Sequence, residues 1–225
     1  MINKRSRELG RANYYKLIFL TLFMATQKQV WNNIASEWYE FKINPSEKVL
    51  NFLKGKKGKI LDLGSGAGRH LRKIPNGKMY LVDFSNKMIK LAKERAKEKK
   101  IDADFSVSGI TKLPFKNNFF DSAIAIAVFH CIKEEKNREK AVKELFRVLK
   151  PKAKALIAVW NKNSKKFRNA KKERYVKWRD RGERYYYLFD ASEIYDLFKK
   201  TGFKIISKET PERNIIFVVQ KPISL

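Results

Sequence analysis

Short apolar runs alternate with helix-period segments along most of the chain. Such runs are typical of buried strands, whereas apolar residues at three- and four-residue spacing indicate amphipathic helices. We expect strands at 59–63, 79–83, 104–107, 122–128, 154–160, 203–208 and 214–220. We expect helices near 46–54, 67–74, 86–99, 136–149 and 191–201, and one earlier amphipathic helix that carries Val30, Trp31, Ile34, Ala35 and Trp38. This alternation predicts an α/β fold with a mostly parallel sheet and helices on both faces.

The last two expected strands break the alternation. Only Glu209–Arg213 separates them, which is enough for a hairpin but too short for a parallel crossover. We therefore expect one domain over 26–225, with a seven-stranded sheet that includes an antiparallel C-terminal hairpin strand.

The first 25 residues do not fit this pattern. Leu17–Ala25 is apolar and follows several basic residues, as in a signal peptide. The run is too short to cross a bilayer as a helix, which takes ~20 residues. Met24 begins a segment that already reads as a domain start, so we treat 1–25 as a poorly specified leader. Translation from a start codon upstream of Met24 is a simpler explanation of this segment than a signal peptide.

Composition adds a strong positive charge to this picture. The chain has 51 Lys+Arg against 23 Asp+Glu, a net charge of +28, which favours polyanions as partners. Lysine excess alone can also reflect codon bias or a solvated high-temperature surface. Cys131 is the only cysteine, so an internal disulfide and a cysteine-rich metal site are excluded, and the chain fits a reducing cytoplasm.

The first chemical signal follows the strand at 59–63 and reads Asp62-Leu63-Gly64-Ser65-Gly66-Ala67-Gly68-Arg69. Glycines at alternate positions let the backbone turn sharply and let a ligand approach bare peptide. A dinucleotide-binding loop would need glycine at 69. The motif instead resembles the first motif of the class I S-adenosylmethionine (SAM) methyltransferases, and a glycine turn in an unrelated α/β protein is the alternative.

The second signal is Asp83, which ends the next strand. A carboxylate at this place in an open α/β sheet hydrogen-bonds the ribose hydroxyls of a nucleoside cofactor. The alternative is an N-cap for the following helix, although Ser85 is better placed for that role.

The third signal carries a departure from the family. Ser108–Phe115 resembles the family segment Ala-Asp-Ala-x-x-Leu-Pro-Phe, but Gly109 replaces the aspartate that holds the adenine amino group. Either a backbone group at Gly109–Ile110 supplies the hydrogen-bond acceptor for the adenine amino group, or adenine is held less tightly. The resemblance implies a SAM site that consists of Asp62, Gly64, Ser65, Gly66, Gly68, Asp83, Phe84, Gly109, Ile110 and Ala127.

Five segments in order narrow the resemblance, over about 28–221, to the tRNA wobble-uridine carboxymethyl O-methyltransferases. These segments are Trp31–Trp38, Leu61–Gly68, Ala125–His130, Ala155–Trp160 and Arg184–Phe189. The resemblance implies methylation of a 5-carboxymethyl wobble uridine to its methyl ester. It also implies the tRNA anticodon loop and a small zinc-binding activator subunit as partners.

The acceptor side offers fewer signals. His130 ends an expected central strand, where ligands sit in open sheets, and it either contacts the substrate or is a satisfied buried histidine. Family members usually carry a second histidine at Cys131, so a histidine pair is not essential here. A carboxylate with a pKa near ~4 is ionised at neutral pH and needs no general base, so we expect catalysis by positioning. The candidates are His130, Trp38, Tyr39, Trp160 and Arg184.

Residues 161–189 form a basic and aromatic insertion. Eleven basic residues lie from Lys162 to Arg184, interleaved with tyrosines and Trp178. Arginine forks suit phosphates and aromatic faces suit unstacked bases, so we expect RNA contacts from this segment. The expected contacts are Arg168, Arg174, Trp178, Arg179, Arg181 and Arg184. The alternative is a solvated cap whose aromatic residues, Tyr185–Tyr187 above all, cover the cofactor pocket.

Two other functions fit the same sequence. The first is a SAM-dependent methyltransferase of a small apolar molecule, such as a quinone precursor or lipid, which would need no basic insertion. The second is a non-enzymatic RNA-binding protein that keeps the fold but has lost SAM, for which Gly109 is the hint.

Overall fold

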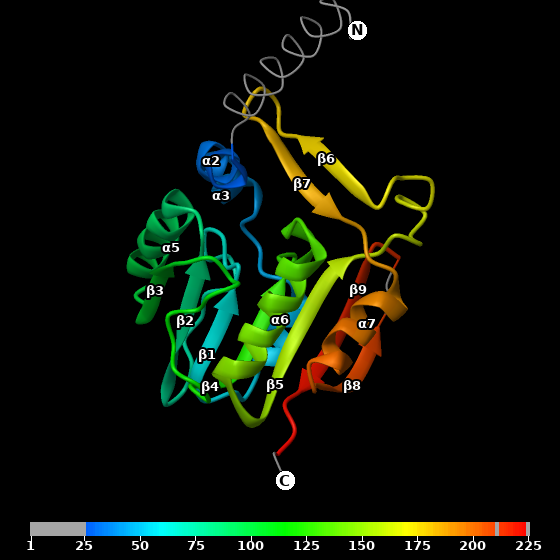
Figure 1. Ribbon diagram of the computed structural model, residues 1–225. Helices are drawn as coiled ribbons and strands as arrows, with labels where there is room; N and C mark the ends of the chain where they lie inside the picture. Colours follow the sequence, from blue (N-terminus) through cyan, green and yellow to red (C-terminus); the bar gives the residue numbers. More distant parts are fainter. Residues whose placement is uncertain (1–25, 210–211, 224–225) are drawn as a thin grey trace, which may run out of the picture.

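The computed structural model describes residues 26–209 and 212–223. Its centre is a seven-stranded sheet in the order β3-β2-β1-β4-β5-β9-β8 (Figure 1). The strands are β1 (Gly58–Leu63), β2 (Gly77–Asp83), β3 (Ala103–Val107), β4 (Phe120–Ile126), β5 (Leu149–Trp160), β8 (Lys204–Glu209) and β9 (Asn214–Gln220). β9 pairs antiparallel with β5 and β8, and the other pairs are parallel. The predicted class I methyltransferase sheet, with its antiparallel hairpin strand, is confirmed.

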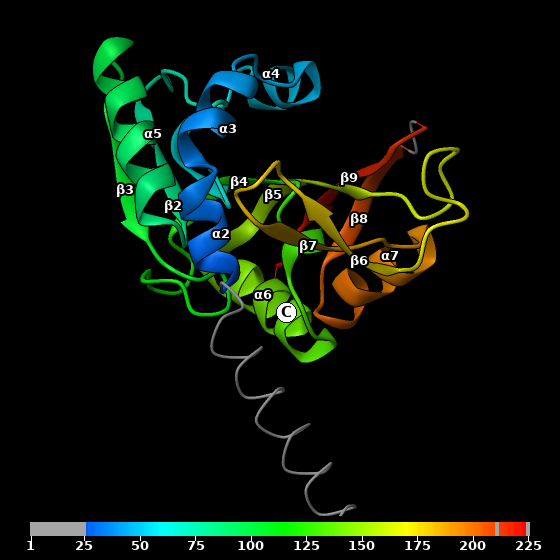
Figure 2. The same cartoon turned by 90° about the horizontal axis from the view of Figure 1, so that it is seen from above.

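Helices cover both faces of this sheet (Figures 1 and 2). They are α2 (Gln27–Asn33), α3 (Ala35–Phe41), α4 (Glu47–Leu53), α5 (Asn86–Glu98), α6 (Glu135–Val148), α7 (Ala191–Lys200) and the short 3-10 helix η1 (Phe129–Cys131). Successive strand residues point to opposite faces. Ile60 therefore packs in the core with α4 and α5, whereas Leu61 packs in the core with α6 and α7. Leu61 lies beside Tyr80 of β2 and Ala123 of β4 in the register of the sheet.

The helix expected at 67–74 is absent, and that prediction was wrong. Turns and irregular backbone connect β1 to β2 instead. Gly64, Gly66 and Gly68 have φ of 69°, 53° and 72°, which is the left-handed region. Left-handed residues interrupt a right-handed helix, and Pro75 limits what can follow them. The single helix expected around 30–38 is likewise two helices, which meet at the fully buried Ile34.

A two-stranded hairpin is the element that the sequence analysis missed. It consists of β6 (Glu173–Lys177) and β7 (Glu183–Tyr187) and lies inside the insertion at 161–189. Gly182, with φ of 117°, stands in the turn between the strands. The hairpin and the α2–α3 pair lie at the same edge of the molecule, above the carboxyl ends of the parallel strands (Figures 1 and 2).

The leader expected at 1–25 lies outside the described residues. Within 26–209 and 212–223, no helix combines the length and the apolar character that a membrane crossing requires.

Candidate cofactor and acceptor site

A cavity of about 400 Å³ opens where the strand order reverses between β1 and β4. Ligands of open α/β sheets sit at this position, outside the carboxyl ends of the strands. The predicted cofactor residues that line the cavity are Gly64, Ser65, Gly66, Asp83, Phe84, Gly109, Ile110 and Ala127. Asp62 and Gly68 do not line it. The structure thus brings most of the predicted cofactor residues to one place.

The glycine loop forms the floor of the cavity. A Cβ at Gly64 would lie 2.3 Å from a methyl carbon of Val128, so contact as well as φ requires glycine there. A Cβ at Gly66 would meet only the Trp38 Nε1 atom, at 3.8 Å, so bare peptide faces open space. Gly68 serves packing instead, because its Cβ would lie 3.1 Å from Ala92 of α5.

Asp83 holds the loop and also faces the cavity. Its Oδ2 accepts the Gly66 N–H at 2.9 Å, and its Oδ1 accepts the Ser85 N–H at 2.9 Å. Burial raises the pKa of Asp83 to about 6, against the opposing effect of these backbone bonds. Each carboxylate oxygen keeps a second lone pair for ribose hydroxyls. The N-cap of α5 is Ser85, whose Oγ accepts the Met88 N–H, so Asp83 is not the cap.

Asp62 lies behind the glycine loop. Its side chain is only 1% exposed, and its Oδ2 has no hydrogen-bond partner within the described part of the chain. Burial raises the pKa of Asp62 to about 7, with Arg69 lowering and Asp83 raising it further. A buried carboxyl with a free acceptor favours a cationic group nearby. The acid, the bare loop and Asp83 together fit SAM, which carries an ammonium, a ribose and an adenine.

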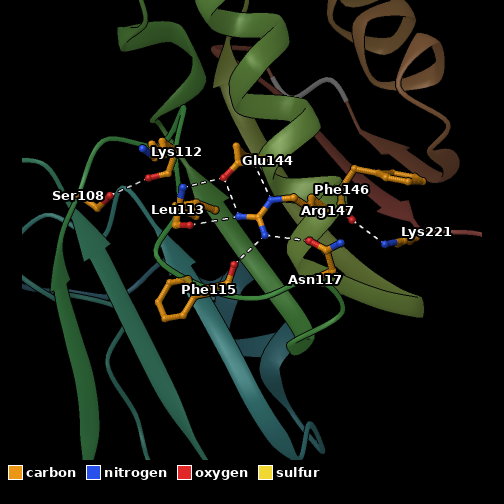
Figure 3. Close-up of polar contacts among 9 residues, drawn as sticks. All are labelled: Ser108, Lys112, Leu113, Phe115, Asn117, Glu144, Phe146, Arg147 and Lys221. Atoms are coloured by element: carbon orange, nitrogen blue, oxygen red, sulfur yellow. Dashed lines mark hydrogen bonds and ion pairs between the residues drawn. The ribbon is translucent and has the colours of Figure 1, made fainter.

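The adenine side of the cavity is a loop anchored to α6 (Figure 3). Glu144 accepts the Leu113 N–H at 2.6 Å, and Arg147 donates to the Leu113 and Phe115 carbonyl oxygens at 3.1 and 2.7 Å. The hydrogen bond from Arg147 lowers the pKa of Glu144. Sequence reasoning missed this pair, because its i,i+3 spacing on a helix gives no sign of the loop it holds.

Gly109 leaves the adenine end open. No atom lies within 4 Å of a Cβ built at this position, so the backbone alone faces the cavity. The chain lacks the aspartate that the family pattern has at position 109, although the structure has space for that side chain.

Aromatic side chains form the opposite wall. Trp31 and Trp38 line the cavity and meet edge to face, with ring centroids 5.3 Å apart. Trp178 of the insertion lies 5.4 Å from Trp38. Arg184 lies behind this wall, 6% exposed, with its guanidinium 4.8 Å from the Trp178 ring and its Nη1 donating to the Tyr186 hydroxyl at 2.7 Å.

His130 is buried beside the cavity rather than in its lining. Its Nδ1 accepts the Trp160 N–H at 3.0 Å, which leaves the proton on Nε2. Burial, followed by the charge of Arg213, lowers the pKa of His130 to about 3, so the ring is neutral. These contacts are those of the satisfied histidine that the sequence left as one alternative. Tyr39 also lies outside the lining and donates to Glu98 at 3.2 Å.

The insertion divides into a buried and an exposed part. Tyr185, Tyr186 and Tyr187 are 0%, 2% and 8% exposed, so they are core residues and present no face to a base. Glu37 of α3 accepts the Trp178 Nε1–H at 2.7 Å and pairs with two arginines of the insertion at 3.3 and 3.4 Å. These arginines are Arg179 and Arg181, whose side chains remain 74% and 53% exposed. Arg168 is exposed and Arg174 is half-buried.

Several cavity residues were not singled out from the sequence, three of them basic or titratable and close to the glycine loop or α3. Arg69 and His70 follow the glycine motif directly, and Lys42 follows α3. His70 is 4% exposed with an unpartnered Nε2, and burial followed by Arg69 lowers its pKa to about 3. For Arg69 and His70, the one sequence signal was their position directly after the glycine motif. Lys42 had no sequence signal, because only the fold brings it to the cavity.

Comparison with known proteins connects this cavity to a chemistry. The family described as "Methyltransferase domain" matches residues 61–157. A tRNA (carboxymethyluridine(34)-5-O)-methyltransferase of Arabidopsis thaliana is 34% identical over 134 residues, which cover 59% of the chain and about a third of that relative. The enzyme of the same name from Schizosaccharomyces pombe is 29% identical over 226 residues, which cover 86% of the chain and 95% of that relative.

Solved structures agree on the fold. A SAM-dependent methyltransferase of Methanosarcina mazei has a TM-score of 0.68 at 22% identity, covering 80% of the chain and all of the solved one. A chain from the complex between the Haloferax volcanii Trm112 methyltransferase activator and a methyltransferase has a TM-score of 0.65 at 16% identity, covering 86% of the chain and 95% of the solved one. At these identities the likeness concerns the fold alone.

Proposed function

We propose that this chain is a SAM-dependent methyltransferase that methylates the carboxylate of a 5-carboxymethyl-type wobble uridine in tRNA. Two relatives that share this printed activity support the proposal, one of them over nearly its whole length. The observation that carries it is that, among the described residues that line the cavity, the histidine and the thiol are unsuited as bases and the one carboxylate holds the glycine loop.

Of the titratable groups that line the cavity, His70, Cys131 and Asp83 are poor proton acceptors or are already engaged. His70 has a pKa of about 3, and burial strongly raises the pKa of the Cys131 thiol. Asp83 holds the glycine loop and faces the ribose position. An efficient general base has a pKa near the operating pH, so methyl acceptors that must first lose a proton fit this cavity poorly. An ionised carboxylate loses none and fits well.

When bound, SAM would supply the methyl group to the ionised carboxylate oxygen, with cleavage of the carbon–sulfur bond and no proton transfer. Asp83 and the glycine loop would hold the cofactor, and the Trp31–Trp38 wall would confine the acceptor. Because opposite charges are neutralised in the step, a dry pocket that aligns both partners accelerates it. Catalysis therefore rests on positioning.

The surface charge supports an RNA acceptor. A net charge of +28 allows many phosphate contacts with release of counterions. Exposed basic residues of the insertion lie on the edge that carries the cavity. They include Lys165, Lys166, Arg168, Lys171, Lys177, Arg179 and Arg181. The buried Tyr185–Tyr187 run takes no part in this surface.

We also propose a small activator subunit as a partner. The fold match to a chain from an activator complex supports it. Co-expression with such a subunit should raise the SAM affinity and the solubility of this chain, and no change in either would contradict the partner without touching the reaction.

The test of the reaction incubates the protein with methyl-labelled SAM and bulk tRNA, followed by mild alkali. We expect label to be released as methanol, the product of a methyl ester. Alkali-stable label, or label transferred only to a lipid extract, would exclude the reaction. Asp83→Asn should abolish transfer, and Glu40→Gln, an exposed change on α3, is the matched control.

A further inference from the structure

We propose that Lys42 and Arg184, supported by the charge of Arg213, form an oxyanion subsite that receives the acceptor carboxylate. The inference rests on the proposed function and adds to it the residues that select a charged acceptor. Lys42 lines the cavity, whereas Arg184 lies behind the tryptophan wall that the cavity shares.

The burial of Arg184 is the first observation. Within the described residues, its Nε is buried without a hydrogen-bond partner, and its one side-chain hydrogen bond is to the Tyr186 hydroxyl. The guanidinium otherwise faces aromatic rings, at 4.8 Å from Trp178, 5.5 Å from Trp38 and 5.9 Å from Trp31. Aromatic faces offset only part of the cost of burying a cation. An anionic ligand would offset the rest of that cost by pairing with the guanidinium.

The convergence of four cations is the second observation. The pKa of Lys42 is lowered by burial and then by the charges of Arg69, Arg213 and Arg184. Among residues 26–209 and 212–223, none of these four lies within 4.0 Å of a carboxylate oxygen. Asp62 interacts electrostatically with Arg69, so the cations without a nearby carboxylate in the described residues are Lys42, Arg184 and Arg213. Like charges repel, so a protein that holds these three together favours an anionic ligand there.

Nearby acids are committed elsewhere. Glu37 is engaged by Trp178 and by Arg179 and Arg181, and Asp83 by the backbone of the glycine loop. Asp62 acts on Arg69, which leaves Lys42, Arg184 and Arg213 available to a ligand. An ionised acid satisfies them and its methyl ester does not, so the same subsite admits the substrate and disfavours the product. One carboxylate oxygen can contact the cations while the other stays free to attack.

The fluorescence of the four tryptophans of the chain can report ligand binding near these cations. Trp31, Trp38 and Trp178 lie within 6 Å of the Arg184 guanidinium, and Trp160 lies 5.2 Å from that of Arg213. The test titrates the protein, saturated with S-adenosylhomocysteine, with 5-carboxymethyluridine and with its methyl ester, and follows tryptophan fluorescence. The variants are Lys42→Met, Arg184→Lys and Arg184→Met. Lys28→Met removes one exposed charge from α2 as the control.

We expect wild type and Lys28→Met to bind the acid about tenfold more tightly than the ester, the factor that corresponds to one good charged contact. Lys42→Met should lose most of this preference with its ester affinity unchanged. Arg184→Lys keeps the charge and should retain part of the preference even if Arg184→Met fails to fold.

Three results would overturn the subsite. The first is equal binding of acid and ester by wild type. The second is a Lys42→Met variant that loses affinity for S-adenosylhomocysteine instead, which would assign the cations to the cofactor carboxylate. The third is equal competition by an unmodified oligonucleotide, which would assign them to phosphate. A persistent acid preference without alkali-labile methylation of tRNA would support the subsite and remove the proposed reaction. Ester formation without the preference would do the reverse.

Discussion

An aspartate at position 109 tests the adenine end of the cofactor site. Gly109→Asp restores the side chain that the family pattern carries and that this chain lacks. The site has room for it, because nothing lies within 4 Å of a Cβ at 109, and φ at Gly109 is not in the left-handed region. We therefore expect a gain in affinity rather than a steric loss.

The magnitude follows from the exposure of the site. A hydrogen bond to a charged group contributes about 1.5–3 kcal/mol when it is well shielded from water. Position 109 is exposed, so we take about 1 kcal/mol, which is roughly fivefold tighter binding. Loss of glycine freedom in the unfolded chain adds stability of about 0.4–1 kcal/mol, but that effect is independent of the ligand.

Calorimetric titration with S-adenosylhomocysteine measures the gain. Gly109→Ala is the matched control, since it removes glycine freedom without adding an acceptor, and it should bind as wild type does. The deaminated analogue, S-inosylhomocysteine, lacks the adenine amino group and should show no gain. An affinity of Gly109→Asp no higher than that of Gly109→Ala would refute the assignment of this loop to adenine.

Three further changes test other parts of the site. Asp83→Asn removes a charged acceptor from the glycine loop and from the ribose, so SAM affinity should fall about 100-fold or more by calorimetry, and binding within threefold of wild type would contradict the assignment. The pKa values of Asp62 and Asp83 are raised from 3.8 to about 7 and about 6, so the folded state retains protons that the unfolded chain has lost. Stability without ligand should thus fall as pH rises from about 4 to about 7 in urea denaturation, and Asp62→Asn should flatten that slope. Glu37→Gln loosens the hairpin from α3 and should lower the melting temperature by about 2–4 °C, the shift for about 1 kcal/mol in a chain of this size. Glu40→Gln should leave the melting temperature unchanged. Equal melting temperatures for the two variants would show that the contacts of Glu37 contribute nothing to stability.

Most of the sheet could be predicted because its strands are apolar runs with clear limits. The helix at 67–74 could not, although its pattern was real. Ala67, Leu71 and Ile74 are all buried, as helical spacing predicts, but Leu71 and Ile74 lie in one core cluster and Ala67 in another, and left-handed glycines carry the chain there in turns. The hairpin β6–β7 was hidden for another reason. Its first strand has charged residues at three of five positions and no fully buried residue, and its second contributes consecutive tyrosines to the core, so neither shows the apolar–polar alternation of a half-buried strand.

The two halves of the site differ in the same way. The cofactor half follows from local motifs, since a glycine loop and an acid at two strand ends are brought together by any parallel sheet. The acceptor half depends on tertiary contacts. Lys42 and Arg184 are far apart in the sequence, and only the docking of the hairpin on α3 brings them together. No spacing rule could have paired them.

The position of β9 has a consequence for synthesis on the ribosome. β9 is the last strand in the sequence, yet it lies between β5 and β8 and completes the hydrogen bonding of both. While residues 214–220 are still in the exit tunnel, β5 presents an open edge and β8 has no partner in the sheet. Unpaired edges attract other chains, so the nascent protein is prone to aggregation until residues 214–220 have emerged. The sheet closes only once β9 has left the exit tunnel.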